Sequence, residues 1–283
     1  MLKKIVLTAF FLAIAFSALS ASSYIKVTDP VFAQIDSSTT QPQAISIGLA
    51  GPGQTLELTA LSDTGEQSAN LSTKGKIANW NVLKIIPSSL PFGWSGEDSL
   101  EFSSPMKARV IIPKNAGDGE YSFTVQAVDN YEGVAPLSFA VKAVVSKDVF
   151  DFRISSDPIK VSVNQKAVYS FELFNKGSAS DVFELSTTGL PEQYSVKKTV
   201  FVPKASKATE SIELNIREAK EYKLSFKAVS LSGPAINGEQ KTTLFVGSDF
   251  LSEAKAAGRG VLLFPSAENA LYSIISFLAN LIF

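Results

Sequence analysis

The stretch Glu120-Tyr121-Ser122-Phe123-Thr124-Val125-Gln126-Ala127-Val128 alternates apolar and polar residues, and it recurs 101 residues later as Glu221-Tyr222-Lys223-Leu224-Ser225-Phe226-Lys227-Ala228-Val229. Such alternation predicts a β-strand with one buried face. Leu90-Pro91 recurs in the same way as Leu190-Pro191, 100 residues further on. A period near 100 residues matches one β-sandwich domain and is far longer than a solenoid repeat. The sequence therefore predicts two homologous domains in tandem, residues 43–147 and 148–247.

Other short alternating runs lie at 54–59, 168–173 and 212–216, and turn residues separate them about every ten positions. Evenly spaced short strands with turns between them are typical of β-sandwiches and barrels. Upstream of the repeat, Leu56-Glu57-Leu58 matches Phe171-Glu172-Leu173 at a larger offset. This larger offset indicates an insertion in the first copy, roughly across 63–76.

The two copies also share turn motifs. The first contains Leu90-Pro91-Phe92-Gly93-Trp94 and the run 112–127, and the second contains Phe174-Asn175-Lys176-Gly177 and Gly189-Leu190-Pro191-Glu192. Over about 200 of the 283 residues, this order resembles the alpha-galactosidase-associated Ig-like domain family, whose tandem repeats occur in prokaryotic cell-surface proteins. The second copy departs from the pattern at 217–220, where its late Pro–Gly turn is replaced, and the first copy lacks the Asn-x-Gly hairpin. The resemblance implies an accessory or structural module rather than a catalyst.

The predicted fold class is all-β, with two tandem immunoglobulin-like β-sandwich domains, an N-terminal signal helix and a C-terminal hydrophobic helix. Residues 1–21 have the form of a signal peptide, because Lys3 and Lys4 precede an apolar run and then small residues. The alternative is an uncleaved membrane anchor, although the run is shorter than the ~20 residues that a span requires. Residues 22–42 are predicted to be a flexible lead-in.

The last segment, 248–283, is predicted to be a helical tail. Its final fourteen residues carry no charge, and the positions 273, 276 and 280 place small polar residues on one helical face. We expect this tail to hold the protein at a membrane. A self-association helix and a helix buried against a neighbouring domain are the alternatives. The apolar residues of this membrane tail are Leu271, Ile274, Ile275, Phe277, Leu278, Leu281, Ile282 and Phe283.

Composition excludes several classes of function. The chain has no Cys and no His, so neither a Ser-His-Asp nor a Cys-His catalytic arrangement can form. The usual ligands of zinc, haem and iron–sulfur sites are missing as well. The net charge of −1 gives no basic surface for nucleic acid. A carboxylate-only enzyme, such as a glycosidase, is not excluded by composition, but nothing in the sequence shows a pair of carboxylates facing a cleft. Together with the resemblance, this predicts no enzyme activity, no cofactor and no nucleic-acid partner.

Two tryptophans are candidate ligand contacts, because an exposed indole can stack on a sugar face. Trp94 is followed by the acidic stretch 97–101, but Tyr194 holds its place in the second copy, which favours a core position. Trp80 lies beside the insertion and has no counterpart, so it is the better candidate for an exposed aromatic. Asn70-Leu71-Ser72 is a glycosylation sequon.

Acidic residues at 118, 120, 129 and 132 offer oxygen ligands for calcium, but they lack an Asp-x-Asp-x-Asp run and are interpreted as solvated turns. We therefore predict no metal site.

The sequence predicts a non-catalytic, exported cell-surface or envelope protein, in which a structural or interaction module is held at the membrane by its C-terminal tail. Its expected partners are the membrane itself and other envelope proteins or glycans. The alternative is a secreted glycan-binding protein, which requires an exposed cleft that gathers aromatic and polar side chains.

Overall fold

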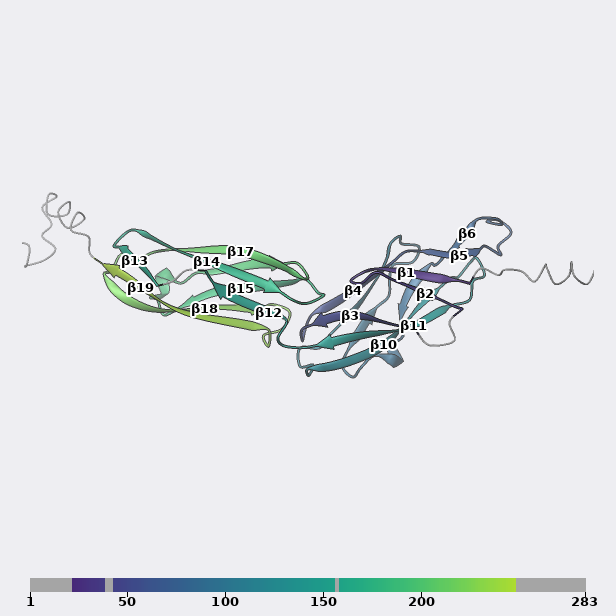
Figure 1. Cartoon of the computed structure of the whole chain (residues 1–283), viewed down its shortest axis with the longest axis horizontal. Coiled ribbons are helices and arrows are strands. Elements are labelled where there is room, and N and C mark those ends of the chain that lie inside the picture. Colours follow the sequence, from purple (N-terminus) through teal and green to yellow (C-terminus); the bar gives the residue numbers. More distant parts are fainter. Residues whose placement is uncertain (1–21, 39–42, 156–157, 248–283) are drawn as a thin grey trace, which may run out of the picture.

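The computed structural model describes residues 22–38, 43–155 and 158–247 (Figure 1). Within these ranges the chain forms nineteen β-strands and two single-turn 3₁₀ helices, η1 (Pro87–Ser89) and η2 (Glu192–Tyr194). This confirms the all-β class. The predicted signal helix and the C-terminal tail lie outside the described residues. No helix of the described ranges is long and apolar enough to cross a bilayer.

The first unit consists of two main sheets around one core. One sheet has the order β2–β1–β4–β9–β8 and the other has the order β3–β11–β10–β7. Their strands are β1 (Tyr24–Asp29), β2 (Ala33–Asp36), β3 (Ala44–Ala50), β4 (Thr55–Ala60), β7 (Val82–Ile85), β8 (Ser95–Glu97), β9 (Met106–Ile111), β10 (Gly119–Val128) and β11 (Leu137–Val145). Alternate side chains of both sheets, such as Leu56, Val110 and Val141, point inward and form one apolar cluster.

The second unit repeats this plan around its own core. A three-stranded sheet of order β12–β14–β17 faces a five-stranded sheet of order β13–β19–β18–β15–β16. The strands are β12 (Phe150–Ile154), β13 (Ile159–Ser162), β14 (Lys166–Asn175), β15 (Asp181–Thr188), β16 (Lys197–Val202), β17 (Ser206–Asn215), β18 (Lys220–Ser230) and β19 (Asn237–Gly247). The rings of Phe152, Phe171 and Phe226 pack at centroid distances of 5.4 and 4.7 Å, so aromatic stacking contributes much of this core.

The repeated stretches occupy equivalent strands, β10 and β18. In each unit the tyrosine at the start of this strand donates a hydrogen bond from its hydroxyl to the carbonyl four residues earlier. Tyr121 donates to Gly117 at 3.0 Å, and Tyr222 donates to Glu218 at 3.4 Å. In each unit a further strand pairs in parallel with the last strand, β3 with β11 and β13 with β19. The repeat therefore extends from sequence to backbone topology.

The predicted insertion forms an extra hairpin. β5 (Asp63–Gln67) and β6 (Ile77–Asn79) make a separate two-stranded sheet between β4 and β7. The equivalent connection of the second unit, 176–180, is only a short turn. Figure 1 shows the hairpin at the end of the first unit that points away from the second.

The prediction of a flexible lead-in at 22–42 is wrong for its larger part. β1 and β2 pair with each other, and β1 also pairs with β4 inside the first sheet. Ile25, Val27 and Ile35 are almost completely buried in the core. The Ser/Thr-rich stretch after β2 gives the whole segment the composition of a linker. The alternating apolar residues of β1 and β2 nevertheless form strands of the first sheet.

A tightly packed joint connects the two units. Gln54 of the first unit donates from Nε2 to Oδ2 of Asp181 in the second at 2.8 Å, and both side chains are buried. The same carboxylate accepts hydrogen bonds from the hydroxyls of Ser230 and Ser232, each at 2.7 Å. The backbone N–H of Ser178 donates to the carbonyl of Leu49 across the joint at 2.6 Å.

Glycines allow the backbones of the two units to touch at this joint. A Cβ built on Gly53 would lie 2.2 Å from the carbonyl oxygen of Ser232, and one on Gly233 would lie 2.2 Å from that of Pro52. An ion pair between Lys204 and Asp29 adds a contact at the edge. Buried hydrogen bonds and direct backbone contact together indicate that the units move as one rod (Figure 1).

Candidate functional site

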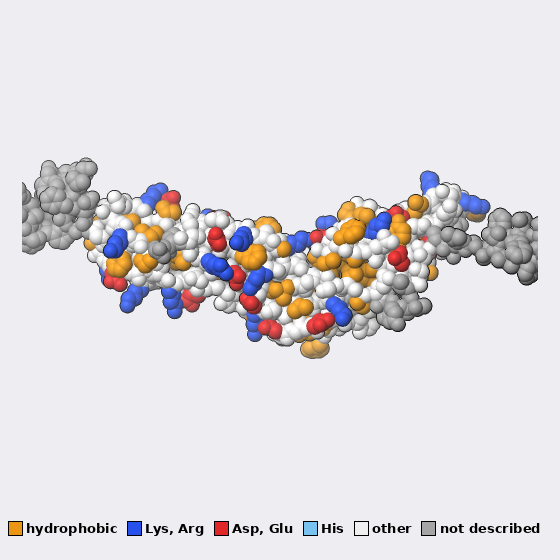
Figure 2. All heavy atoms as spheres, viewed as in Figure 1, with side chains coloured by type: hydrophobic (Ala, Val, Ile, Leu, Met, Phe, Trp, Pro, Cys, Tyr) orange, Lys and Arg blue, Asp and Glu red, His pale blue; other side chains and the backbone are white. Residues whose placement is uncertain are grey.

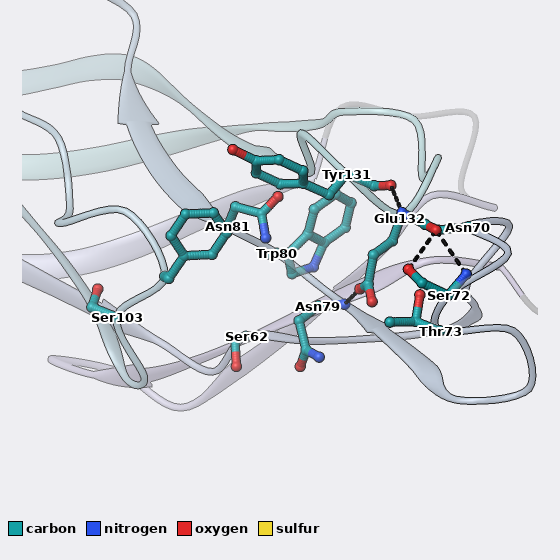
Figure 3. Close-up of a pocket in the computed structure, with 11 residues that line it drawn as sticks. Ser62, Asn70, Ser72, Thr73, Asn79, Trp80, Asn81, Ser103, Tyr131 and Glu132 are labelled. Atoms are coloured by element: carbon teal, nitrogen blue, oxygen red, sulfur yellow. Dashed lines mark hydrogen bonds between the residues drawn. The ribbon is translucent and has the colours of Figure 1, made fainter.

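A cleft of about 470 Å³ lies at the far end of the first unit, beside the inserted hairpin. Three segments surround it: the hairpin, the loop between β8 and β9, and the turn between β10 and β11. Its volume is within the range of about 300–1,000 Å³ typical of small-molecule sites. Figure 3 shows side chains from all three segments converging on it.

Two exposed aromatic rings form one wall of the cleft. Phe102 is 60% exposed and Tyr131 is 58% exposed, and their ring centroids are 5.3 Å apart with planes tilted by 40°. Phe102 has a φ of 59°, in the left-handed region that side chains rarely adopt. Its N–H donates to the carbonyl of Asn81 at 2.8 Å, which helps to hold this conformation. The loop thus presents the ring to solvent although the backbone is strained.

The turn that carries Tyr131 is organised by Asp129. Its carboxylate accepts hydrogen bonds from the backbone N–H groups of Tyr131, Glu132 and Val134 at 2.8–3.0 Å. Partial burial opposes ionisation, but these backbone donors outweigh it and hold the pKa of Asp129 below its ordinary value. The charged carboxylate therefore fixes the turn at neutral pH.

Polar contacts join this turn to the inserted hairpin. Glu132 accepts a hydrogen bond through Oε2 from the backbone N–H of Asn79 at 2.5 Å. The Asn70 side chain donates from Nδ2 to the carbonyl of Tyr131 at 3.1 Å. The carbonyl of Glu132 also accepts from the N–H of Ala69 at 2.8 Å. The insertion and the turn consequently form one continuous rim (Figure 3).

Several polar groups of the cleft are free to bind a ligand. Among the described residues, the amide side chain of Asn79, the hydroxyl of Tyr131 and the second carboxylate oxygen of Glu132 have no hydrogen-bond partner. None of the described residues that line the cleft is Lys or Arg. The arrangement offers hydrogen-bond donors and acceptors beside an apolar wall, with a single negative charge.

Both tryptophans are buried, so Trp80 is not the exposed aromatic that its place beside the insertion predicted, whereas the core position favoured for Trp94 agrees with the structure. Trp80 is 1% exposed and forms the floor of the cleft, where its Nε1 donates inward to the carbonyl of Tyr24 at 2.8 Å. Trp94 is 8% exposed and packs on Tyr121 at a centroid distance of 5.2 Å. Each indole instead fills the core.

The acidic residues after Trp94 do not form a site with it. Asp98 accepts from the backbone N–H of Ile85 at 2.8 Å, and Glu101 accepts from the side chain of Asn130 at 2.8 Å. Within 22–38, 43–155 and 158–247, no group of three or more carboxylates lies close enough to hold a metal ion.

Asn70, the predicted glycosylation site, lies on the rim of the cleft. Its Oδ1 accepts hydrogen bonds from the N–H and the hydroxyl of Ser72 at 3.0 and 2.8 Å. Glycosylation of Asn70 remains a prediction. A glycan attached there would occupy the mouth of the cleft.

Sequence reasoning correctly associated Trp80 with the insertion but missed Phe102 and Tyr131. Tyr131 follows Asp129-Asn130, a typical turn sequence, and an aromatic residue at the tip of a polar turn is a usable signal of exposure. For Phe102 the signal is weaker, because Leu100-Glu101-Phe102 alternates apolar and polar residues as a strand does.

No family model and no curated protein matches this chain. Among solved structures, a chimeric titin Z1Z2 functionalized with a decorin peptide is similar at a TM-score of 0.33 and 13% identity, over 81% of this chain and 100% of that one. A β-glucosidase from Listeria innocua has a TM-score of 0.27 and 12% identity over 35% of this chain, which spans only 16% of the enzyme. A PapD-like domain of human CEP192 has a TM-score of 0.25 and 14% identity, over 36% of this chain and 85% of that domain. These scores are too low to transfer a function.

Proposed function

We propose that this chain is a non-catalytic, exported surface protein in which two tandem immunoglobulin-like β-sandwiches form a stalk, held at a membrane by the C-terminal tail. The hydrogen-bonded tyrosine at the start of β10 and β18 supports the immunoglobulin-like assignment, because such a tyrosine corner is a hallmark of that fold. The parallel pairing of β3 with β11 and of β13 with β19, the last strand of each unit, also supports it.

The joint between the units is the observation that carries the proposal. Buried Gln54 and Asp181 hydrogen-bond across it, and backbones touch at Gly53 and Gly233. A joint of this kind keeps two domains aligned, which a projecting stalk requires. β19 ends at one pole of the rod, while the hairpin β5–β6, which borders the cleft, lies at the other pole (Figure 1). Attachment through the tail would therefore place the cleft farthest from the membrane.

The surface supports an interaction role rather than catalysis. On the face shown in Figure 2, acidic and basic side chains are interspersed over both units. The cleft is lined by one carboxylate, Glu132, whereas hydrolysis of a glycosidic bond generally requires a pair. The chain also lacks His and Cys throughout.

Membrane partitioning tests the proposal. The full-length chain and a version ending at Gly258 are expressed with residues 1–21, and the membranes are washed with carbonate and with high salt. We expect only the full-length chain to remain in the washed membrane. If both versions wash free, membrane attachment is wrong and a secreted binding protein becomes the better interpretation.

A further inference from the structure

We propose that the cleft beside the inserted hairpin binds a neutral glycan, with the apolar face of a sugar ring on Phe102 and Tyr131 and its hydroxyls on Asn79 and Glu132. The inference names a partner class for the interaction role proposed above and rests on that role, but it does not depend on membrane attachment.

The aromatic wall has no evident purpose in folding. Both rings are more than half exposed, and neither belongs to the apolar cores. Phe102 is moreover held at a positive φ, a backbone conformation that is strained for residues other than glycine. Exposed apolar rings on a strained loop are a feature of binding sites, since packing alone would favour burial.

The free polar groups of the cleft suit the hydroxyls of a neutral sugar. Tyr131 offers a hydroxyl beside its ring, Asn79 offers an amide, and Glu132 offers one carboxylate oxygen as an acceptor for a ligand hydroxyl. A phosphate or an acidic sugar would be repelled by the negative charge of Glu132, because no Lys or Arg is among the described lining residues. A neutral polyol with one apolar face fits both the wall and the polar rim.

The position of the cleft in the repeat supports the same conclusion. The two units share the pairing of their central strands, but the hairpin β5–β6 that builds the rim belongs to the first unit. The inserted hairpin is also tied to the β10–β11 turn by hydrogen bonds through Asn70, Asn79 and Glu132, so the rim is preformed. Additional loops on a rigid scaffold are where binding functions are most often placed.

A glycan array tests the inference with the full-length chain, purified in a detergent without a sugar headgroup. The array carries neutral oligosaccharides of glucose, galactose, mannose and N-acetylhexosamines, together with uronic-acid and sialylated glycans. We expect retention on at least one neutral glycan and weaker retention on its acidic counterparts. Affinity for the retained glycan is then measured in solution by calorimetry.

Variants identify the site. Tyr131→Ala and Phe102→Ala are each expected to weaken the measured affinity by about tenfold or more, because anchoring aromatic side chains carry much of the energy of a binding site. Phe92→Ala is the matched control, since Phe92 is a fully exposed phenylalanine of the same unit outside the cleft. It is expected to bind within about twofold of the unmodified protein.

The inference is overturned if no neutral glycan is retained, if acidic glycans bind better, or if the two cleft variants bind as well as Phe92→Ala does. Melting curves of all variants verify that the fold is unchanged. Because the substituted side chains are exposed, we expect all variants to melt at nearly the same temperature. Loss of membrane retention with intact glycan binding would refute the proposed attachment alone, and the reverse result would refute only the glycan site.

Discussion

Replacing Gln54 with methionine tests the joint between the two units. Gln54 is 1% exposed, and each end of its amide is engaged. Its Nε2 donates to the Asp181 carboxylate at 2.8 Å, and its Oε1 accepts from the N–H of Gly51 at 2.7 Å. Methionine has nearly the same length and preserves the packing, but it can make neither of these hydrogen bonds well.

The expected loss follows from these two bonds. A hydrogen bond to a charged group contributes roughly 1.5–3 kcal/mol, and a buried N–H left without a partner costs about 1–3 kcal/mol. Asp181 keeps its hydroxyl donors, Ser230 and Ser232, which limits the penalty on the carboxylate. We therefore expect Gln54→Met to lower the free energy of unfolding by about 3 kcal/mol.

Urea denaturation followed by tryptophan fluorescence measures this loss. The chain has two tryptophans, Trp80 and Trp94, and both lie in the core of the first unit, so the signal reports on that unit. With a slope of about 1–3 kcal/mol per molar urea, the midpoint should fall by roughly 1–3 M. X-ray scattering of the folded variant should show a broader distribution of orientations between the units.

Gln126→Met serves as the control, because the Gln126 side chain donates to Ser138 at 3.0 Å on an exposed face. It should change the free energy of unfolding by less than about 0.5 kcal/mol. In a double-mutant cycle with Asp181→Asn, the coupling with Gln54 should be about 1 kcal/mol or more. If Gln54→Met destabilises no more than Gln126→Met, the joint is not held by this buried contact and the reasoning is refuted.

Three further predictions concern the cores and the turn beside the cleft. Phe171→Ala should lower the free energy of unfolding by about 3–5 kcal/mol in thermal or urea melts, because a fully buried ring is lost, whereas the exposed Phe92→Ala should cost less than about 0.5 kcal/mol. Tyr169→Phe should raise stability by about 1 kcal/mol, since the Tyr169 hydroxyl is buried without a hydrogen-bond partner among the described residues; a loss would reveal a partner. Burial raises the pKa of Tyr169 to about 12 from 10.0, so its neutral form contributes stability that is lost as the pH rises from 10.0 towards 12; this decline should be smaller in Tyr169→Phe. Asp129→Asn should speed hydrogen exchange at the Tyr131 amide, and unchanged exchange at neutral pH would contradict the role of Asp129 in the turn. The same variant should remove a contribution to stability that exists above the ordinary carboxyl pKa and is lost as the pH falls through the lowered pKa of Asp129.

The sequence by itself determined the all-β class, the repeat and the presence of an insertion. These features depend on residues that are close together in the sequence. The alternation in β10 and β18 has the period of a strand, and each strand buries one face. The match between Trp94 and Tyr194 also favoured a core position for the indole, and the structure places Trp94 in the core.

Only the tertiary structure decided the rest. The core role of β1 depends on pairing with β4, a strand some thirty residues away, and β2 joins the sheet through β1. Local composition does not encode these partners. The joint depends on Gln54 and Asp181, which are separated by 127 positions in the chain. The cleft likewise forms where Phe102 and Tyr131 meet the inserted hairpin. Exposure, hydrogen-bond partners and cavities are properties of such long-range contacts, so they arise only when the sheets have packed.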